Sequence, residues 1–331
     1  MKKINYKKYT KMNEGTGWRR ISDDKPIENY WFENWKISQK EKAVFRNCIF
    51  VNGKEDGLQL LGSSSSFFNC VFAFNKRNGI SIGKNAHDIK FYDCFFSNNG
   101  EQGAVLNHCK DVYFYNCTFE ENEMQGISLI GKNMLRSCII KNNKKGIGFY
   151  STDCSDLYDC KIIDNKICSI QIFDKSSPII QSTSICGGKE NIVITDNTFP
   201  VFESCEISGQ KVTGICLGKN AKCRLLKTKI FDQIPLKKFK EGLSVGIGMA
   251  DNAKLFADKC DFFSTTNRLK HICIFLLGKS SAEVTDSKLH DCDVAVKLWS
   301  HSSCLCSWCK IDKENYMASR EEDACIEFRN C

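Results

Sequence analysis

The sequence predicts an all-β solenoid, and three repeated features support that prediction. A cysteine recurs every 21–24 residues through much of the chain. Large apolar residues stand at fixed positions before and after it, and they alternate with other residues. A fixed period of this length is typical of stacked repeats. The period-two pattern with many Phe and Ile residues indicates strands rather than helices.

The stretch from Ile89 to Asn99 shows one repeat, and we call its cysteine, Cys94, the anchor. Ile89 and Phe91 precede the anchor, Phe96 follows it by two positions, and Asn99 follows it by five. The remaining anchors are Cys48, Cys70, Cys117, Cys138, Cys160, Cys205, Cys260 and Cys309, with Thr183, Thr228 and Ser287 in the gaps.

The position two after the anchor is large and apolar in all twelve repeats: Phe50, Phe72, Phe96, Phe119, Ile140, Ile162, Ile185, Ile207, Ile230, Phe262, Leu289 and Ile311. The L-x-x-L-x-L-x-x-N signature of leucine-rich repeats, which have a similar period, is missing. The sequence therefore predicts a single-stranded right-handed parallel β-helix of about twelve rungs.

Residues 1–42 do not fit the repeat, and we expect them to form an arm and an N-terminal cap. Residues 1–17 are polar and basic, which is typical of a mobile arm. The first rung of a stack exposes backbone groups and an apolar cross-section, so a cap is required. The expected cap, with a docking motif for a partner as the alternative, is the segment that holds Trp18, Tyr30, Trp31, Phe32 and Trp35. Residues 43–331 are the expected β-helix.

Asparagines and glycines mark the turn that follows each anchor. Asn tolerates left-handed backbone, and stacked Asn side chains bond along an axis, so we expect a structural ladder. Its members are Asn75, Asn99, Asn122, Asn143 and Asn165. Glycine suits the sharp bend at the start of the next strand. These glycines are Gly57, Gly79, Gly103, Gly126 and Gly146.

Two features are candidate binding surfaces. The outward face of the glycine-led strands is small and nearly uncharged, and a flat strip of this kind suits an extended ligand. Its polar members are Gln59, Ser81, Ser128 and Gln171. Two insertions leave the repeat at the same turn, where solenoids often carry their binding loops. Their basic residues are Lys237, Lys238, Lys240, Arg268 and Lys270. A solvated sheet face and tolerated length drift are the alternatives.

The end of the chain has two interpretations. Phe328–Cys331 repeats Phe45–Cys48, which makes Cys331 another anchor. The segment Asp323–Phe328 also matches Asp293–Leu298, which makes it a glycine-type strand, and we favour this second interpretation. Under either interpretation, we expect the stack of rungs to continue or a partner to cover its last rung.

Composition narrows the class of protein. The chain has 331 residues, a net charge of +8 and 21 cysteines. No apolar run reaches the ~18 residues that span a bilayer, and no apolar segment follows the basic start, so we expect a cytoplasmic protein with reduced, buried thiols. Basic and acidic residues are interspersed, so a nucleic-acid ligand is not expected, whereas an acidic partner surface stays possible.

The repeat resembles the pectate-lyase-like β-helix superfamily. The resemblance covers about Ala43 to Cys331 and rests on G-I-x-I…I-x-F-x-D-C-x-F-x-x-N, as in Gly79–Ile82 followed by Ile89–Asn99. It is closest to the carbohydrate-binding and sugar-hydrolase repeats, which also occur in β-helix F-box and SHC-binding proteins. No F-box-like helical segment fits in residues 1–42. The resemblance implies the fold and a carbohydrate-related activity.

The catalytic motifs of that superfamily are largely absent. The N-x-D and G-H-G motifs of polygalacturonases are missing, and the one Asp-Asp pair, Asp23-Asp24, lies outside the repeat. Arg268-Leu-Lys270 fits R-x-K but stands alone. The outward row lacks the carboxylates that Ca²⁺ needs. We therefore expect no catalytic residues and no cofactor.

The histidines give no site either. His301, Cys304, Cys306 and Cys309 have loosely zinc-like spacing, but the repeat places the three cysteines inside, so we expect no metal. His87, His108 and His271 have no nucleophile patterned beside them, and we expect them on the surface or in turns.

These observations lead to two functional hypotheses. The first is a non-catalytic scaffold that mediates protein–protein interaction within a cytosolic assembly. It rests on the bare outward face, the reduced core and the basic loops. The alternative is a carbohydrate-active enzyme or glycan-binding module of the polysaccharide lyase or hydrolase kind, which rests on the resemblance.

Overall fold

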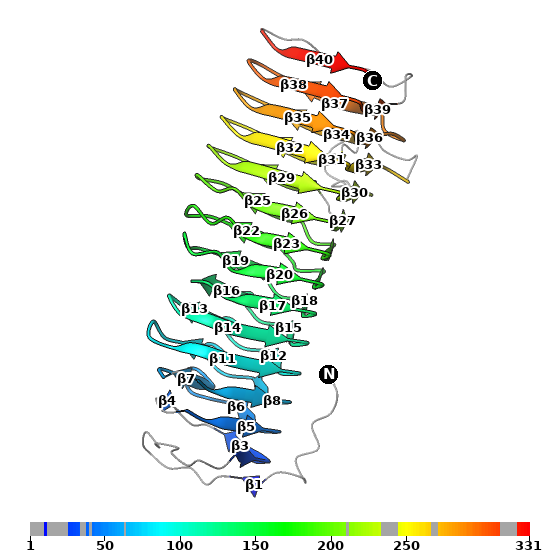
Figure 1. Cartoon of the computed structure of the whole chain (residues 1–331). Coiled ribbons are helices and arrows are strands. Elements are labelled where there is room, and N and C mark those ends of the chain that lie inside the picture. The colour runs from blue at the N-terminus through cyan, green and yellow to red at the C-terminus, as the bar shows by residue number, and fades with distance from the viewer. Residues whose placement is uncertain are drawn as a thin grey trace. The chain divides into compact units, whose positions relative to one another are not determined.

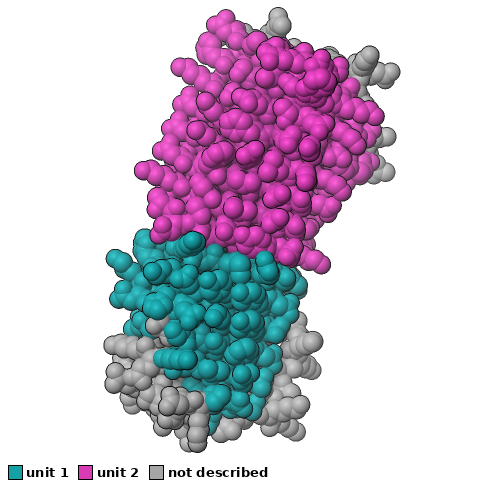
Figure 2. Space-filling model, viewed as in Figure 1, with its two compact units in different colours: residues 1–148 teal, residues 149–331 magenta. Residues whose placement is uncertain are grey.

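The computed structural model describes residues 10–11, 26–33, 38–39, 42–62, 64–209, 212–232, 244–265, 271–311 and 323–331. The chain divides into two compact units, residues 1–148 and residues 149–331, which Figure 2 colours separately. Each unit is a stack of rungs with three kinds of strand (Figure 1). We call them leading strands (before the anchor), anchor strands (after the anchor) and glycine strands.

In unit 1 the three kinds of strand recur in chain order, and neighbours in a stack pair in parallel. The leading strands are β2 (Ile27–Glu28), β5 (Val44–Arg46), β8 (Ser66–Phe68), β11 (His87–Tyr92), β14 (Lys110–Tyr115) and β17 (Met134–Arg136). The anchor stack comprises β1 (Thr10–Lys11), β3 (Tyr30–Glu33), β6 (Ile49–Val51), β9 (Val71–Ala73), β12 (Phe95–Ser97), β15 (Thr118–Glu120) and β18 (Ile139–Lys141). The glycine strands are β4 (Ser38–Gln39), β7 (Leu58–Leu60), β10 (Ile80–Ile82), β13 (Ala104–Asn107), β16 (Gln125–Ile130) and β19 (Lys145–Phe149), which ends one residue past the unit.

Unit 2 repeats the same arrangement. Its leading strands are β20 (Asp156–Tyr158), β23 (Ile179–Gln181), β26 (Val201–Glu203), β29 (Lys222–Leu226), β32 (Lys254–Asp258), β35 (Ser281–Thr285), β38 (Ser303–Ser307) and β40 (Cys325–Arg329). Its anchor strands are β21 (Lys161–Ile163), β24 (Ser184–Cys186), β27 (Glu206–Ser208), β30 (Lys229–Phe231), β33 (Asp261–Phe263), β36 (Lys288–Leu289) and β39 (Lys310–Ile311). Its glycine strands are β22 (Cys168–Ile172), β25 (Glu190–Ile194), β28 (Thr213–Leu217), β31 (Ser244–Met249), β34 (His271–Leu276) and β37 (Val294–Leu298).

The inward columns confirm the predicted register. Phe72 pairs with Phe96 on the next anchor strand, and their ring centroids lie 4.8 Å apart in a stacked geometry. A second Phe column on the leading strands stacks in the same way, with 4.6 Å between Phe91 and Phe114. The two columns meet edge to face, 5.8 Å apart at Phe91 and Phe96. Because all four rings are fully buried, these columns form the apolar core of unit 1.

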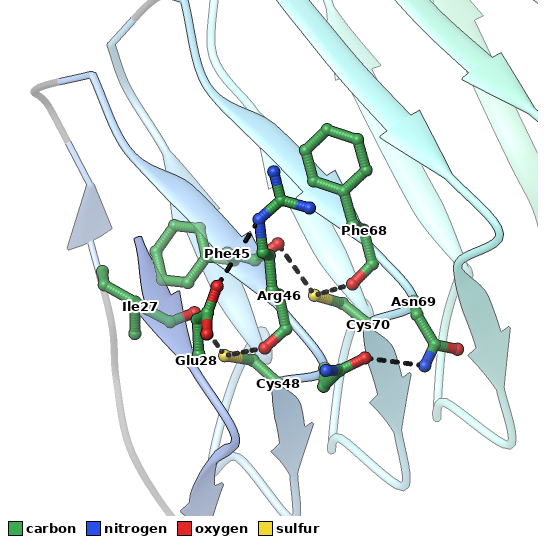
Figure 3. A network of polar contacts seen from close by, with 9 residues as sticks. Ile27, Glu28, Phe45, Arg46, Cys48, Phe68, Asn69 and Cys70 are labelled. Atoms are coloured by element: carbon green, nitrogen blue, oxygen red, sulfur yellow. Dashed lines mark hydrogen bonds and ion pairs between the residues drawn. The ribbon is translucent and has the colours of Figure 1, made fainter. Parts of the chain in front are cut away.

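The anchor cysteines point inward as free thiols, as predicted. Cys94 is 1% exposed, and its Sγ lies 3.3 Å from the carbonyl of Tyr92 and 3.6 Å from that of Phe67 one rung back. Figure 3 shows the same pattern at Cys48 and Cys70. The hydroxyl that replaces a thiol at Thr228 donates to a carbonyl of the neighbouring rung, 3.3 Å away.

The predicted Asn ladder is present in unit 1. The Nδ2 of Asn99 donates to the Oδ1 of Asn122 at 2.9 Å and to the carbonyl of Phe72 at 3.1 Å. The expected left-handed backbone lies one residue earlier, for example at Asn98, with φ of 52°. The ladder residue therefore serves for its hydrogen bonds, whereas its predecessor makes the bend.

Strand pairing also extends to residues before the repeat recognised in the sequence. Ile27 pairs with Phe45 and Trp31 pairs with Ile49, so residues 27–33 form a further rung, although we expected residues 1–42 to lie outside the repeat. Trp18 and Trp35 of the expected cap lie outside the described residues.

At the other end, β40 pairs with the leading strand β38, and Phe328 stands beside Cys306. Cys331 therefore takes an anchor position, and the favoured assignment of this segment as a glycine-type strand is wrong.

Candidate functional site

A cluster of carboxylates, histidines and hydroxyls occupies one turn of unit 2. It lies between the anchor strands and the glycine strands of three successive rungs. The two predicted insertions, Phe231–Lys240 and Ser264–Lys270, both leave the repeat here, and residues 233–243 and 266–270 lie outside the described residues. The cluster comprises Asp232, Ser244, Asp261, Thr265, His271, His290, Asp291 and Asp293.

His290 is at the centre of the first part of the cluster. Its Nε2 lies 2.8 Å from the Oδ1 of Asp261, one rung earlier, and its Nδ1 lies 2.6 Å from the Oδ2 of Asp291. The imidazole stacks on Phe263, with centroids 5.2 Å apart and planes 10° apart. The imidazole is thus fixed by stacking and by a carboxylate at each nitrogen.

The electrostatics of this group favour a protonated imidazole. Partial burial lowers the pKa of His290, but the hydrogen bonds and charges of Asp291 and Asp261 outweigh burial, and the net pKa is raised. The His290 and Asp261 side chains are 29% and 30% exposed, so solvent and a ligand can reach them. Asp291 is 65% exposed and is the more easily displaced of the two carboxylates.

The second part of the cluster joins described residues that flank the two insertions. Where the segments start, Asp232 accepts hydrogen bonds from the backbone N–H and hydroxyl of Thr265, at 2.6 and 2.8 Å. Where they end, the Oγ of Ser244 lies 2.8 Å from the Nδ1 of His271. Asp293 accepts a bond from the backbone N–H of His271 at 2.6 Å. The described residues that flank the two insertions are therefore hydrogen-bonded to one another.

His271 contradicts the expectation of an isolated surface or turn residue. It is 1% exposed and bonds to Ser244, and its Nε2 has no partner. Burial lowers its pKa to about 4, against the opposing charges of Asp293 and Asp232. His271 is therefore neutral at neutral pH, whereas His290 holds its proton more tightly than usual. The pKa values of these two neighbouring histidines are thus shifted in opposite directions, which is a recurrent feature of acid–base sites.

The residues predicted to bind a ligand are only partly brought together. Gln59 and Ser81 are neighbours on β7 and β10 and half-buried, while Ser128 on β16 is buried. Gln171 belongs to unit 2 and accepts a bond from the hydroxyl of Tyr150 at 3.4 Å. The five predicted basic residues, Lys237, Lys238, Lys240, Arg268 and Lys270, lie outside the described residues.

Sequence reasoning missed the Asp261–His290–Asp291 group. Asp261 and His290 are 29 positions apart and meet only through the stacking of rungs. A signal was available, because both fall on outward positions of the repeat and Asp291 and Asp293 flank Cys292 in the turn. Screening the outward columns of every strand for carboxylates would have found the group.

The zinc-like constellation is not a site among the described residues. Cys304, Cys306 and Cys309 are buried as predicted, and His301 pairs with Asp323 at 3.6 Å. Nowhere in the described ranges do three or more His, Cys, Asp or Glu side chains form a group that could hold a metal ion. Nor does the described part of the chain contain a helix that could span a membrane.

Comparisons with known proteins support the fold. Residues 36–185 match the family model of the right handed beta helix region. The solved structure of the Agl-KA catalytic domain has a TM-score of 0.51 at 10% identity, covering 88% of this chain and 62% of that chain. No curated protein sequence matches the chain.

Two epimerase structures are also similar to this chain. The periplasmic alginate epimerase AlgG has a TM-score of 0.49 at 11% identity, with 94% of this chain and 83% of that chain covered. The A-module of the Azotobacter vinelandii mannuronan C-5 epimerase AlgE6 has a TM-score of 0.46 at 7% identity, with 95% and 88% covered.

The prediction of a non-catalytic scaffold is corrected. The similar Agl-KA structure, with a TM-score of 0.51, is a catalytic domain, and this fits the carbohydrate alternative better than a scaffold. The prediction failed because it judged the outward face by the glycine strands alone, which carry few charges. The family match over residues 36–185 and the stacked parallel sheets together show that the chain has the right-handed parallel β-helix fold.

Proposed function

We propose that the protein is a carbohydrate-active enzyme that cleaves a polysaccharide, with Asp261, His290 and Asp291 of unit 2 as its acid–base centre. One observation carries the proposal: a partly exposed imidazole is held between two carboxylates. Cleavage of a glycosidic bond needs a proton donor and a carboxylate that acts as base or nucleophile. This turn supplies both.

The exposures assign the roles. Asp261 is the less exposed carboxylate, and it orients the imidazole through Nε2. The sugar displaces the exposed Asp291 from Nδ1, so that the Nδ1–H of His290 donates its proton to the leaving glycosidic oxygen. The displaced Asp291 accepts a proton from the attacking water, whose oxygen bonds to the anomeric carbon. An imidazole that transfers a proton while a carboxylate orients it is a common arrangement in catalytic sites.

The test is a screen for new reducing ends on acidic and neutral polysaccharides. With a cleaved substrate in hand, His290→Gln and Asp291→Asn should each lower kcat by about 100-fold or more, the usual contribution of general acid–base catalysis. His108→Gln, at an exposed histidine of unit 1, is the matched control and should leave kcat unchanged. Cleavage that survives both substitutions would refute the assignment.

The pH profile gives an independent check. The donor must be protonated, so kcat should fall as the pH rises through the raised pKa of His290. Asp261→Asn removes one of the charges that raise this pKa, and it should move the alkaline limb to lower pH. A limb that stays in place would show that another group supplies the proton.

A further inference from the structure

The outward side of the leading strands in unit 1 carries a continuous aromatic row. Arg46, Phe68, Tyr92, Tyr115 and Arg136 follow one another on β5, β8, β11, β14 and β17, and each pairs with the next in register. Their inward neighbours, such as Phe67 and Phe91, are fully buried, whereas Phe68, Tyr92 and Tyr115 are half-buried. We call these five residues the aromatic row.

The rings of the row stack on one another. Phe68 and Tyr92 have centroids 5.0 Å apart and planes 5° apart, and Tyr92 and Tyr115 have centroids 5.0 Å apart and planes 9° apart. The guanidinium of Arg46 lies 4.3 Å above the ring of Phe68 and ends the stack on that side. Tyr113 widens the surface, with its centroid 6.3 Å from that of Tyr115. Because stacking occupies the ring faces, the row presents ring edges and phenol hydroxyls.

Ring edges select a particular kind of ligand. The edge of an aromatic ring is the positive end of its quadrupole, so it attracts electron-rich oxygen atoms. The phenol hydroxyls both donate and accept hydrogen bonds. Stacking also holds the rings in place before binding, so little side-chain entropy is lost. The complementary ligand is an extended chain that is rich in hydroxyl and ether oxygens.

The charges beside the row decide between a neutral and an anionic ligand. Arg46 pairs with Glu28 at 3.6 Å, as Figure 3 shows, and Lys90 pairs with Asp88 at 3.2 Å. Asp93 and Asp111 on the same rungs add negative charge. A polyanion would have to displace these partners and would meet the carboxylates. We propose that the aromatic row is a binding site for a neutral polysaccharide, separate from the acid–base centre of unit 2.

The test measures binding without catalysis. Affinity gel electrophoresis on the His290→Gln protein uses a soluble β-glucan, a mannan and a xylan, with alginate and pectate as anionic counterparts. At least one neutral polymer should retard the protein, with no weakening when the salt concentration is raised. A substitution of both Tyr92 and Tyr115 by Ala should weaken binding about tenfold or more, since buried aromatic anchors dominate such contacts.

Two further variants keep the outcome interpretable. Tyr92→Val with Tyr115→Val retains strand propensity and serves if the Ala pair unfolds. Tyr158→Ala changes the half-buried tyrosine at the equivalent position of β20 in unit 2 and should leave the affinity unchanged. The proposal is overturned if no neutral polymer binds, if alginate or pectate binds more tightly, or if a folded double variant binds like the parent. Binding of a neutral polymer, together with cleavage that survives His290→Gln and Asp291→Asn, would instead reject only the catalytic centre.

Discussion

Replacing Asn122 with Ala should cost unit 1 a large part of its stability. Asn122 is 1% exposed, and its side chain takes part in four hydrogen bonds. Its Nδ2 donates to the Oδ1 of Asn143 at 2.9 Å and to the carbonyl of Phe96 at 3.2 Å. Its Oδ1 accepts from the backbone N–H and the Nδ2 of Asn99, at 3.1 and 2.9 Å.

The magnitude follows from these four bonds. A buried hydrogen bond contributes about 1 kcal/mol net, so the loss is about 4 kcal/mol. The backbone N–H of Asn99 keeps no partner in the cavity, and leaving a buried donor unpaired costs a further ~1 kcal/mol or more. A typical domain is stable by only about 5–15 kcal/mol. One side chain of the ladder thus accounts for a sizeable fraction of that stability.

Equilibrium unfolding in urea under reducing conditions, followed by circular dichroism, measures this loss. Asn107→Ala is the matched control, because Asn107 is an exposed residue at the end of β13, and the change should stay within ~0.5 kcal/mol. Hydrogen exchange at the amide of Asn99 should accelerate in Asn122→Ala and not in Asn107→Ala. If the two variants differ by less than about 1.5 kcal/mol, the ladder does not stabilise the stack as argued.

Three other predictions follow from the remaining features. Burial lowers the pKa of His271 to about 4, so below pH 6.5 the unfolded chain binds a proton that the folded chain does not bind. The free energy of unfolding should therefore be highest above pH 6.5 and fall between pH 6.5 and about 4. His271→Gln should reduce this fall when unfolding is measured as a function of pH. Trp308 is 67% exposed with a φ of 58°, at a position where most other rungs hold Asn, Asp or Ser, so Trp308→Asn should raise the free energy of unfolding by about 1 kcal/mol in the same urea assay. Mass spectrometry after brief alkylation should find Cys325 modified and Cys94 protected until the protein unfolds, and early modification of Cys94 would contradict the inward anchor column.

The inward-facing residues could be predicted because they recur at fixed positions of one sequence repeat. A rung presents a large apolar side chain and a thiol or small hydroxyl at fixed positions, and in unit 1 also an amide, since each packs or bonds against the neighbouring rung. Phe96, Cys94 and Asn99 therefore stand in the sequence as they stand in the stack. The rung at residues 27–33 was not predicted because Tyr30 stands where the other rungs have an anchor Cys, Thr or Ser.

The outward half follows no such rule, and this is why the candidate sites were missed. Outward positions need only tolerate solvent, so their residues vary from rung to rung, and a functional group is assembled from single residues about 20–30 positions apart. Asp261 and His290 form a group only because β33 and β36 are neighbours in the stack, and the same holds for Tyr92 and Tyr115 on β11 and β14. The register deduced from the core already fixes which outward residues are neighbours. In this fold, outward residues that lie far apart in the sequence become neighbours along a column, so a group such as Asp261 and His290 forms no linear motif.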